Sequence, residues 1–312
     1  MPISNYPAGF PMGVTIRGVP VTQLHSGKVF WCGNNSSLLI GEKGASDSNN
    51  GSYLAPFSTL AYALTQVVAG RGDIVVLKPG FVCTVISATQ LAIPANTAVI
   101  GLGSGDYRAT INLTTGTTSK IAFSGAGASM ANVLVTGGID AIVSPIVVSA
   151  ADITLQDVEY RDVTGKAILG VLTTAAANRL LIERFFFNGA AAAAATAAIA
   201  IVGGDAIEIK DFFLYGNFSV SAIDIRTTAT TRLRVKKGTV HNLNASCVCV
   251  KDTITASTGY IGPDLYFQLL TNAANITEAA TGATFVYFPS IYVVNLAGEQ
   301  AMVINITAST DA

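Results

Sequence analysis

The sequence predicts an all-β protein that winds into a single-stranded parallel β-helix. One observation is a repeat between Asn132 and about Phe267, in which a polar or charged residue precedes three mostly apolar residues. Successive copies begin 25, 27, 27, 26 and 27 residues apart. A period this regular indicates stacked units, each burying its apolar face on the next. The copies begin at Asn132, Asp157, Arg184, Asp211, Lys237 and Asp264.

The second observation is that each period holds three short apolar pieces separated by Gly, Asn, Thr and Ser bends. Pro145–Val148 and Ile153–Leu155 are two such pieces, and the repeat itself supplies the third. Short Val/Ile-rich strands are typical of parallel ladders whose inner face is buried. Leucine-rich repeats share the period, but the regular Leu and Asn positions that they need are missing. Three-sided coils are therefore expected.

Residues 1–43 are predicted to form an extended N-terminal anchoring arm. Proline at positions 2, 7, 11 and 20 blocks helix and favours extended backbone. A neighbouring chain is the expected support for this arm, and the alternative is an arm folded back on its own domain. The residues expected to anchor it to a capsid are Tyr6, Phe10, Ile16, Arg17, Phe30 and Trp31.

Residues 44–290 are assigned to the β-helix, with a capping helix near 58–69. Leu60, Leu64, Val67 and Val68 fall on one helical face. A short amphipathic helix before the first strand would cover the exposed edge of the first coil. Residues 291–312 are predicted to form C-terminal strands or a cap.

Three segments near the start carry a resemblance to a known family. Asp47–Ser52 reads Asp-x-Asn-x-Gly-Ser, Pro56–Leu64 reads Pro-Phe-x-Thr-Leu-x-x-Ala-Leu, and Gly72–Gly80 reads Gly-Asp-x-Val-x-Leu-x-Pro-Gly. Together they resemble the opening of right-handed parallel β-helix proteins of the pectate-lyase-like superfamily. Gly13–Pro20 and His25–Trp31 are similar to N-termini of virion structural proteins of tailed bacteriophages. The resemblance implies a right-handed coil and a place in a phage particle.

An aromatic stripe is expected on the outside of one sheet. Alternate strand residues face opposite sides. In Phe185–Phe187 the residues facing either side of the strand are apolar. Phe186, Phe213 and Tyr266 are therefore predicted to point outward and to form an apolar patch, which marks an interface. A homotrimer closing around this patch is the expected assembly. The alternative is a local loop that covers the stripe.

Composition narrows the choice of partners. Charged residues make up 12% of the chain and the net charge is −1, which argues against a nucleic-acid surface because that needs clustered Lys and Arg. No apolar run reaches the length of about 18–20 residues that a membrane span needs. Neither nucleic acid nor membrane is expected as a partner.

The sequence carries no recognised catalytic or cofactor motif. Hydrolysis would need two carboxylates about 5 Å or about 6.5–9.5 Å apart on a groove. Asp157 and Asp211 occupy equivalent repeat positions, but Arg184 between them indicates a charge ladder at a coil corner. His241 is interpreted as a turn residue at a coil bend, and His25 is remote from it. No enzyme activity, metal or cofactor is expected. The coil-edge acids considered were Asp157, Glu159, Glu183, Glu208, Asp211 and Asp224.

The sequence therefore predicts a structural protein of a bacteriophage virion, most simply a trimeric capsid decoration or cement protein. The arm would attach it to the major capsid protein or another virion protein, after assembly in the host cytoplasm. The alternative is a tailspike or fibre that binds host polysaccharide, with cleavage as a further option.

Overall fold

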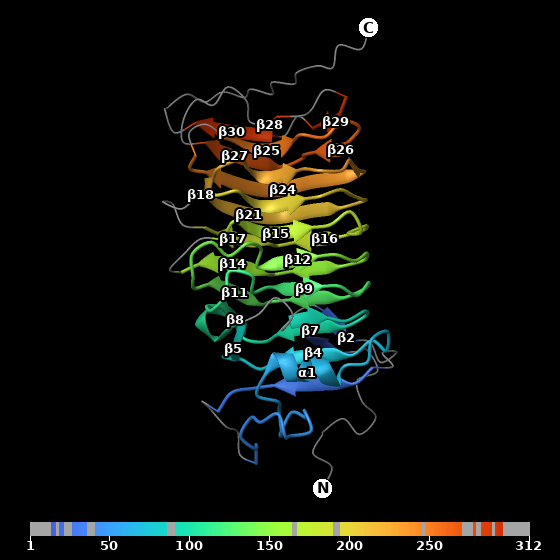
Figure 1. Ribbon diagram of the computed structural model, residues 1–312, viewed down its shortest axis with the longest axis vertical. Coiled ribbons are helices and arrows are strands. Elements are labelled where there is room, and N and C mark those ends of the chain that lie inside the picture. Colours follow the sequence, from blue (N-terminus) through green and yellow to red (C-terminus); the bar gives the residue numbers. More distant parts are fainter. Residues whose placement is uncertain are drawn as a thin grey trace.

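The computed structural model describes residues 14–16, 19–21, 27–35, 41–85, 91–163, 167–189, 194–244, 247–269, 277–278, 282–288 and 291–295. Within these residues the chain is a parallel β-solenoid, stacked from its N-terminal to its C-terminal end (Figure 1). The predicted β-helix architecture is confirmed at this level. The right-handed coil and the roles of the capping helix and arm stay predictions.

The first face of the solenoid is a parallel ladder that begins at β3 and ends at β29. Its strands are β3 (Val29–Cys32), β4 (Ile74–Leu77), β7 (Ala98–Gly101), β10 (Ser129–Ala131), β13 (Thr154–Gln156), β16 (Leu181–Glu183), the first half of β21 (Glu208–Phe218), the first half of β24 (Leu233–Asn242), β26 (Thr258–Ile261) and β29 (Thr284–Tyr287).

The second face is a parallel ladder that shares the long strands β21 and β24 with the first, because both continue through the corner. Its strands are β5 (Val82–Val85), β8 (Thr110–Leu113), β11 (Leu134–Gly137), β14 (Glu159–Asp162), β17 (Phe186–Asn188), the second halves of β21 and β24, β27 (Leu265–Leu269) and β30 (Ile291–Asn295).

The third face is a separate eight-stranded parallel sheet. Its strands are β6 (Leu91–Ile93), β9 (Ile121–Phe123), β12 (Ile146–Val148), β15 (Leu169–Thr173), β19 (Ala197–Ile201), β22 (Ser221–Ile225), β25 (Val248–Asp252) and β28 (Thr277–Glu278). The remaining pairs are β1 (Val14–Ile16) with β2 (Val19–Val21), β20 (Gly204–Asp205) with β23 (Thr230–Thr231), and β18 (Ala194–Ala195) on the end of β21.

The core consists of columns of inward side chains that stack from coil to coil. Tyr160, Phe187 and Leu214 follow one another in register on the second face, and all three are buried. The rings of Tyr160 and Phe187 lie 5.3 Å apart, and those of Phe187 and Phe218 lie 5.5 Å apart. Burial of such large rings is the main stabilising contribution in a repeat fold.

The leading residue of every sequence repeat adopts a left-handed backbone conformation at the corner between the first and second faces. The φ angles are 54° for Asn132, 52° for Asp157, 50° for Arg184, 54° for Asp211, 51° for Lys237 and 60° for Asp264. Asn and Asp tolerate this region better than other L-residues do. The repeat therefore begins with a polar residue because the corner needs this backbone turn.

The N-terminal motif is explained by the contacts of one carboxylate. Asp47 accepts hydrogen bonds from the backbone N–H groups of Ser58 and Thr59, each at 3.0 Å, and from Thr59 Oγ1 at 2.8 Å. Thr59 in turn caps helix α1 (Leu60–Gln66) by accepting from the N–H of Tyr62. The loop that resembles the β-helix family thus fixes the start of the helix.

Part of the predicted arm belongs to the solenoid itself. Strand β3 pairs in parallel with β4, so the boundary placed at residue 43 was wrong for this segment. Phe30 is 8% exposed within the common core, and the ring of Trp31 packs edge-on against Tyr53 at 4.9 Å. Both candidate anchoring residues therefore contact their own chain.

The other candidate arm residues are less fully placed. Ile16 lies in β1, paired with Val19 of β2. Tyr6, Phe10 and Arg17 lie outside the described residues, so the anchoring role stays a prediction. Of the C-terminal segment, β30 continues the second face by pairing with β27, and residues 296–312 lie outside the described part. No helix among the described residues is long and apolar enough to cross a membrane.

Candidate functional site

The predicted aromatic stripe lies on the outer side of the second face. Phe186 pairs with Phe213, which pairs with Thr239, and the column continues through Tyr266 to Tyr292. Phe186 is 46% exposed and Tyr292 is 60% exposed, while Phe213 and Tyr266 are half-buried. Their neighbours along each strand point into the core, as the alternation of strand residues requires.

A second outward column beside it brings in two residues that the sequence argument did not select. Tyr215 and His241 are paired across β21 and β24. The His241 ring lies 5.2 Å from the ring of Phe213, 6.4 Å from that of Tyr215 and 6.2 Å from that of Tyr266. His241 therefore joins the rings on either side of Thr239 into one surface, which we call the aromatic stripe (Phe186, Phe213, Tyr215, His241, Tyr266 and Tyr292).

The position of His241 corrects the earlier interpretation of this residue. It lies within strand β24 and not at a coil bend, because β24 runs without interruption through the corner at Lys237. Partial burial among the rings lowers the pKa of His241 below its usual value. The imidazole is thus held in its neutral form near pH 7, when it is both a hydrogen-bond donor and an acceptor.

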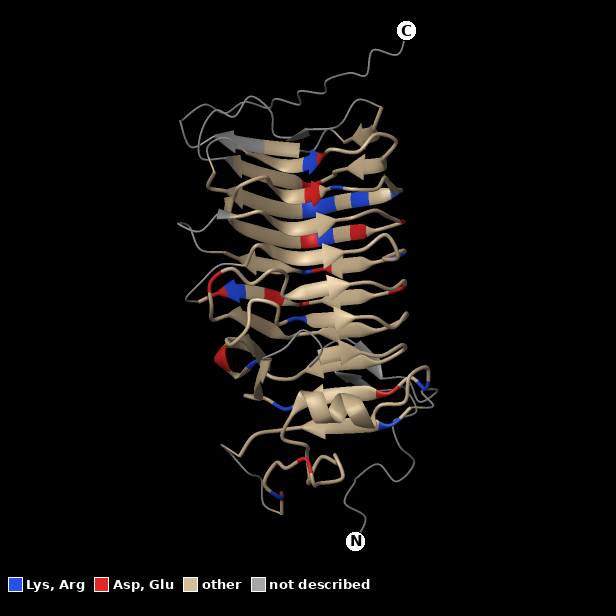
Figure 2. Cartoon of the chain, in the orientation of Figure 1, with Lys and Arg blue, Asp and Glu red and all other residues tan. Residues whose placement is uncertain are grey.

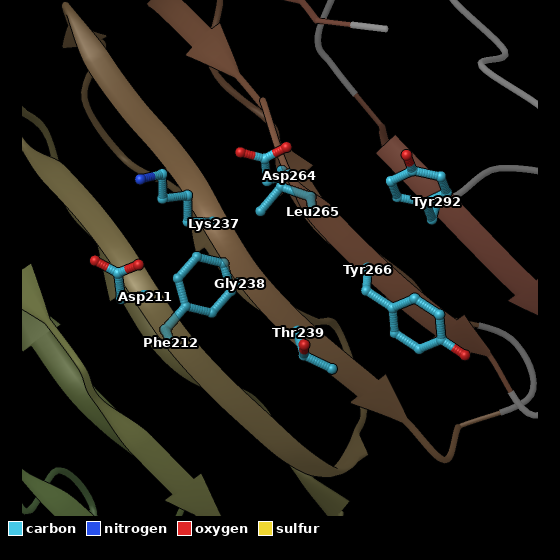
Figure 3. A pocket seen from close by; sticks show the side chains of 9 residues that line it. All are labelled: Asp211, Phe212, Lys237, Gly238, Thr239, Asp264, Leu265, Tyr266 and Tyr292. Carbon is cyan, nitrogen blue, oxygen red and sulfur yellow. The ribbon is translucent and has the colours of Figure 1, made fainter. Parts of the chain in front are cut away.

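A shallow pocket of about 460 Å³ lies between the corner and the aromatic stripe (Figure 3). Gly238, one of the residues that line it, has no side chain where β24 leaves the corner. The Phe212 ring occupies this space, since a Cβ atom at position 238 would lie 2.4 Å from Phe212 Cζ. The pocket is lined by Asp211, Phe212, Lys237, Gly238, Thr239, Asp264, Leu265, Tyr266 and Tyr292.

Three exposed charges form the rim of the pocket. Asp211, Lys237 and Asp264 occupy the same corner position in three successive coils, as Figure 3 shows. Among the residues that the structure describes, no ion pair within 4.0 Å involves any of the three. The charges of this rim are therefore left for solvent or for a ligand.

The lower part of the same corner is different, because its charges are paired. Arg184 Nε donates to Asp157 Oδ1 at 2.7 Å, and Arg184 Nη1 donates to Glu183 Oε1 at 2.7 Å. The predicted charge ladder at the corner is thus present between Asp157 and Arg184 but is not continued as ion pairs to Asp211. Figure 2 shows the charges of both signs that gather on β21 and β24.

The other acids considered from the sequence are committed to partners. Glu159 pairs with Arg108 and with Arg161, and Glu208 pairs with Lys236 at 2.8 Å. Asp224 is buried on the third face beside Arg226, and this burial raises the pKa of its carboxyl above the usual value. None of these acids lines the pocket.

The pocket can hold a polar ligand, and its chemistry is limited by the spacing of its acids. Asp211 and Asp264 lie two coils apart, which corresponds to about 10 Å between their backbones at the usual strand spacing. The range for an inverting pair, about 6.5–9.5 Å, is measured between the carboxyl groups, so these two acids meet it only if their side chains lean toward each other. Within the described residues, no group of three or more His, Cys, Asp or Glu side chains could hold a metal ion.

The sequence contained a signal for the residues that were missed. Tyr292 follows Tyr266 by one period of the repeat, and His241 follows Tyr215 by one period, so both could have been placed on the same face by counting. The missing information was the corner geometry, which shows that β24 and β30 continue the ladder.

Comparisons with known proteins give structural likeness only. No protein-family model matches the chain, and no curated protein sequence matches it. Among solved structures, a rhamnogalacturonan lyase is similar with a TM-score of 0.41 and 13% identity, over 89% of this chain and 90% of that one. A GH136 lacto-N-biosidase from Eubacterium ramulus is similar with a TM-score of 0.40 and 11% identity, over 87% of this chain and 69% of that one.

The names of these similar proteins correct one expectation. Both are named as enzymes, a glycoside hydrolase and a lyase, which contradicts the prediction of a non-enzymatic protein that was made from the absence of catalytic motifs. That exclusion is withdrawn. At this level of identity the likeness assigns no activity to this chain.

Proposed function

We propose that the protein is a polysaccharide-binding β-solenoid that holds an extended glycan along the aromatic stripe. The observation that carries this proposal is that the exposed rings of the aromatic stripe lie beside charged side chains that make no ion pair among the described residues. Aromatic faces stack on the apolar faces of sugar rings, and charged or amide groups beside them bind the hydroxyls. A ladder that repeats at every coil, about 4.8 Å apart, suits a ligand that is itself a linear repeat.

The setting that we propose is the surface of a bacteriophage particle, as a tail spike or fibre. This rests on the resemblance of Gly13–Pro20 and His25–Trp31 to N-termini of virion structural proteins of tailed bacteriophages. Binding to a host polysaccharide would then bring the particle to its cell. Whether the protein also cleaves the bound glycan is to be measured in the same experiments.

The proposal is tested by the affinity of the full chain for a panel of surface polysaccharides, measured by affinity electrophoresis. Tyr266→Ala is expected to weaken binding about twofold to tenfold, since a stacked ring contributes about 0.5–1.5 kcal/mol. The matched control is Tyr107→Ala, because Tyr107 is 72% exposed and lies away from the stripe in the short 3₁₀ segment Gly105–Tyr107. Equal loss in both variants would contradict the proposal.

Cleavage is measured on the same samples. New reducing ends would show glycan cleavage, and a product that absorbs in the ultraviolet from its new double bond would show elimination. If Asp211 and Asp264 act as acid and base, Asp211→Asn and Asp264→Asn should each abolish the reducing ends while the glycan stays bound.

A second candidate is a trimeric capsid decoration protein, in which the stripe is an interface between copies. The exposure of Phe186 and Tyr292 at the two ends of the stripe favours this candidate, because large exposed apolar patches mark interfaces. Copy number in the particle separates the two candidates: hundreds of copies on the head would support decoration, and a few copies at the tail would support the spike.

A further inference from the structure

We propose that the aromatic stripe binds a ribbon-forming, β-1,4-linked glycan with one sugar residue on each coil. This inference rests on the proposed function and goes further by naming the linkage class of the glycan and its register on the protein. It is carried by two neighbouring rows of uncharged side chains that repeat coil by coil on the outer side of the second face.

The first of these, the ring row, supplies one ring per coil. The centroids of the Phe186 and Phe213 rings lie 6.2 Å apart. The His241 ring lies 5.2 Å from that of Phe213 and 6.2 Å from that of Tyr266. Tyr292 continues the row by pairing in register with Tyr266. The strands β17, β21, β24, β27 and β30 thus contribute one ring each.

The rings of this row keep part of their faces open. Successive ring planes are tilted by 33°, 51° and 49°, so none of these pairs is stacked in parallel. Phe186 and Tyr292 at the two ends are exposed, and the three rings between them are half-buried. A ring that its neighbours already hold in place loses little side-chain freedom when a sugar packs on its open part.

The second, the polar row, lies two residues further along each strand. It consists of Asn188, Tyr215, His241 and Gln268, which pair in register on four successive coils. Alternation places them on the same outer side as the ring row, and none of them is buried. On β24 the two roles change over, because Thr239 offers a hydroxyl in the ring column while His241 supplies the ring.

The composition of the two rows matches the surface of an uncharged sugar. Amide, phenol and neutral imidazole groups can each donate and accept hydrogen bonds. Each of four successive coils therefore presents a ring for the apolar face of a sugar and a polar group for its hydroxyls. Because both rows are uncharged, this recognition does not depend on the balance of charges at the corner.

The repeat distance of the coils selects the linkage. Coils follow one another at the strand spacing of about 4.8 Å, and each pyranose of an extended β-1,4-linked chain advances by nearly the same length. Such a chain can place one sugar on every coil and stay in register along the whole row. An α-1,4-linked glucan curls into a helix, so its sugars leave a straight row after a few residues.

Both rows end at a pair of charged residues next to Phe186. The register partner of Phe186 in the preceding coil is Glu159, and that of Asn188 is Arg161. Glu159 and Arg161 form an ion pair of 2.7 Å with each other, and Glu159 also pairs with Arg108. These charges continue neither row. The five rings from Phe186 to Tyr292 therefore provide places for about five sugars, at one sugar per strand spacing.

The experiment is a calorimetric titration of the full chain with oligosaccharides of two to six sugars. Cello-oligosaccharides and manno-oligosaccharides supply the β-1,4 linkage, and malto-oligosaccharides supply the α-1,4 linkage on the same glucose units as the cello series. With a β-1,4 series, each added sugar up to five is expected to tighten binding about twofold to tenfold as a further ring is covered. The malto series should gain nothing beyond two or three sugars.

Variants of the ring row test the register. Phe186→Ala removes an end ring, so the affinity should level off at four sugars. His241→Ala divides the row into two pairs of rings, so the affinity should level off at two. Tyr107→Ala, away from the stripe, should leave the length dependence of the parent unchanged.

The opposite results have distinct meanings. Equal binding of the cello and malto series, or an affinity that does not depend on length, would overturn the inference and leave polysaccharide binding intact. Binding of polysaccharides without binding of either β-1,4 series would do the same. Absence of binding to every polysaccharide of the panel would overturn the proposed function itself.

Discussion

The ring of Phe212 lies against the backbone of Gly238, which occupies the next coil of the same ladder. The two residues are paired in register between β21 and β24, and no side chain other than hydrogen fits at position 238 beside this ring. The contact closes the core at the corner, and both residues line the pocket.

Replacement of Gly238 by alanine should therefore destabilise the protein, because the added methyl group would collide with the Phe212 ring. We expect Gly238→Ala to lower the free energy of unfolding by about 1–3 kcal/mol, the usual cost of overpacking. Adding Phe212→Leu should recover part of this loss, because the smaller side chain vacates the space. Chemical denaturation of the two variants checks the result, and a Gly238→Ala protein as stable as the parent would contradict the packing described.

Glycine should stabilise the protein at a corner where a residue with a Cβ atom has a left-handed backbone and no functional side chain. Ala206 has φ at 55°, and glycine adopts this conformation without the cost that a Cβ atom brings. Ala206→Gly is expected to raise the free energy of unfolding by about 0.5–1 kcal/mol, after the entropy of the unfolded glycine is deducted. Ala222→Gly, in the buried strand β22, should instead lower it.

Acid should destabilise the first coil through Asp73. Burial alone would raise the pKa of this carboxyl, but hydrogen bonds from Arg71, Val68 N–H and Lys28 N–H outweigh it and hold the pKa below its usual value. The unfolded chain then binds the proton more readily, so this stability is complete above the ordinary Asp pKa of about 3.9. It is lost as the pH falls through the lower pKa of the folded state.

The corresponding variant is Asp73→Asn. It should lower the free energy of unfolding at pH 7 by about 1–3 kcal/mol, because charge-assisted hydrogen bonds are lost. The difference between variant and parent should shrink between pH 4 and pH 2, if both remain folded there, as measured by urea denaturation at each pH. A difference that stays constant over this range would show that the Asp73 charge is not the cause.

The homotrimer proposed from the sequence can be tested on the aromatic stripe. If copies meet there, Phe186→Asp should reduce the mass measured by light scattering from that of three chains to that of one, 32.1 kDa. Tyr107→Asp, away from the stripe, should leave the mass unchanged. A parent protein that already has the mass of one chain would rule out the trimer and leave the stripe open to glycan.

Much of the fold was readable from the sequence because stacking imposes one period on every coil. The residues that begin the repeat, Asn132 through Asp264, are the corner residues of the structure, and the outward direction of Phe186, Phe213 and Tyr266 followed from alternation in a strand. Strand β3 was missed because it is the first of its ladder. No earlier copy of the repeat exists in the sequence to mark Phe30 and Trp31 as part of a coil.

The candidate site was only partly predictable. Asp211 was recognised as a corner acid, but whether Arg184 pairs with it or with Asp157 depends on side-chain direction, which the repeat does not contain. His241 was assigned to a bend because its polar neighbours in the sequence, Asn242 and Asn244, are typical of turns. The continuous hydrogen bonding of β24 to β21 and β27 overrides that local preference.

The sequence by itself determined the coil, its three faces and the side on which the aromatic residues lie, because period and alternation are one-dimensional properties. Only the tertiary structure decided which charges are paired across coils and which remain open at Asp211, Lys237 and Asp264. It also decided that the space beside Gly238 is taken by the Phe212 ring. These features depend on distances between side chains about 26 residues apart, and such distances are set by packing of the assembled coils.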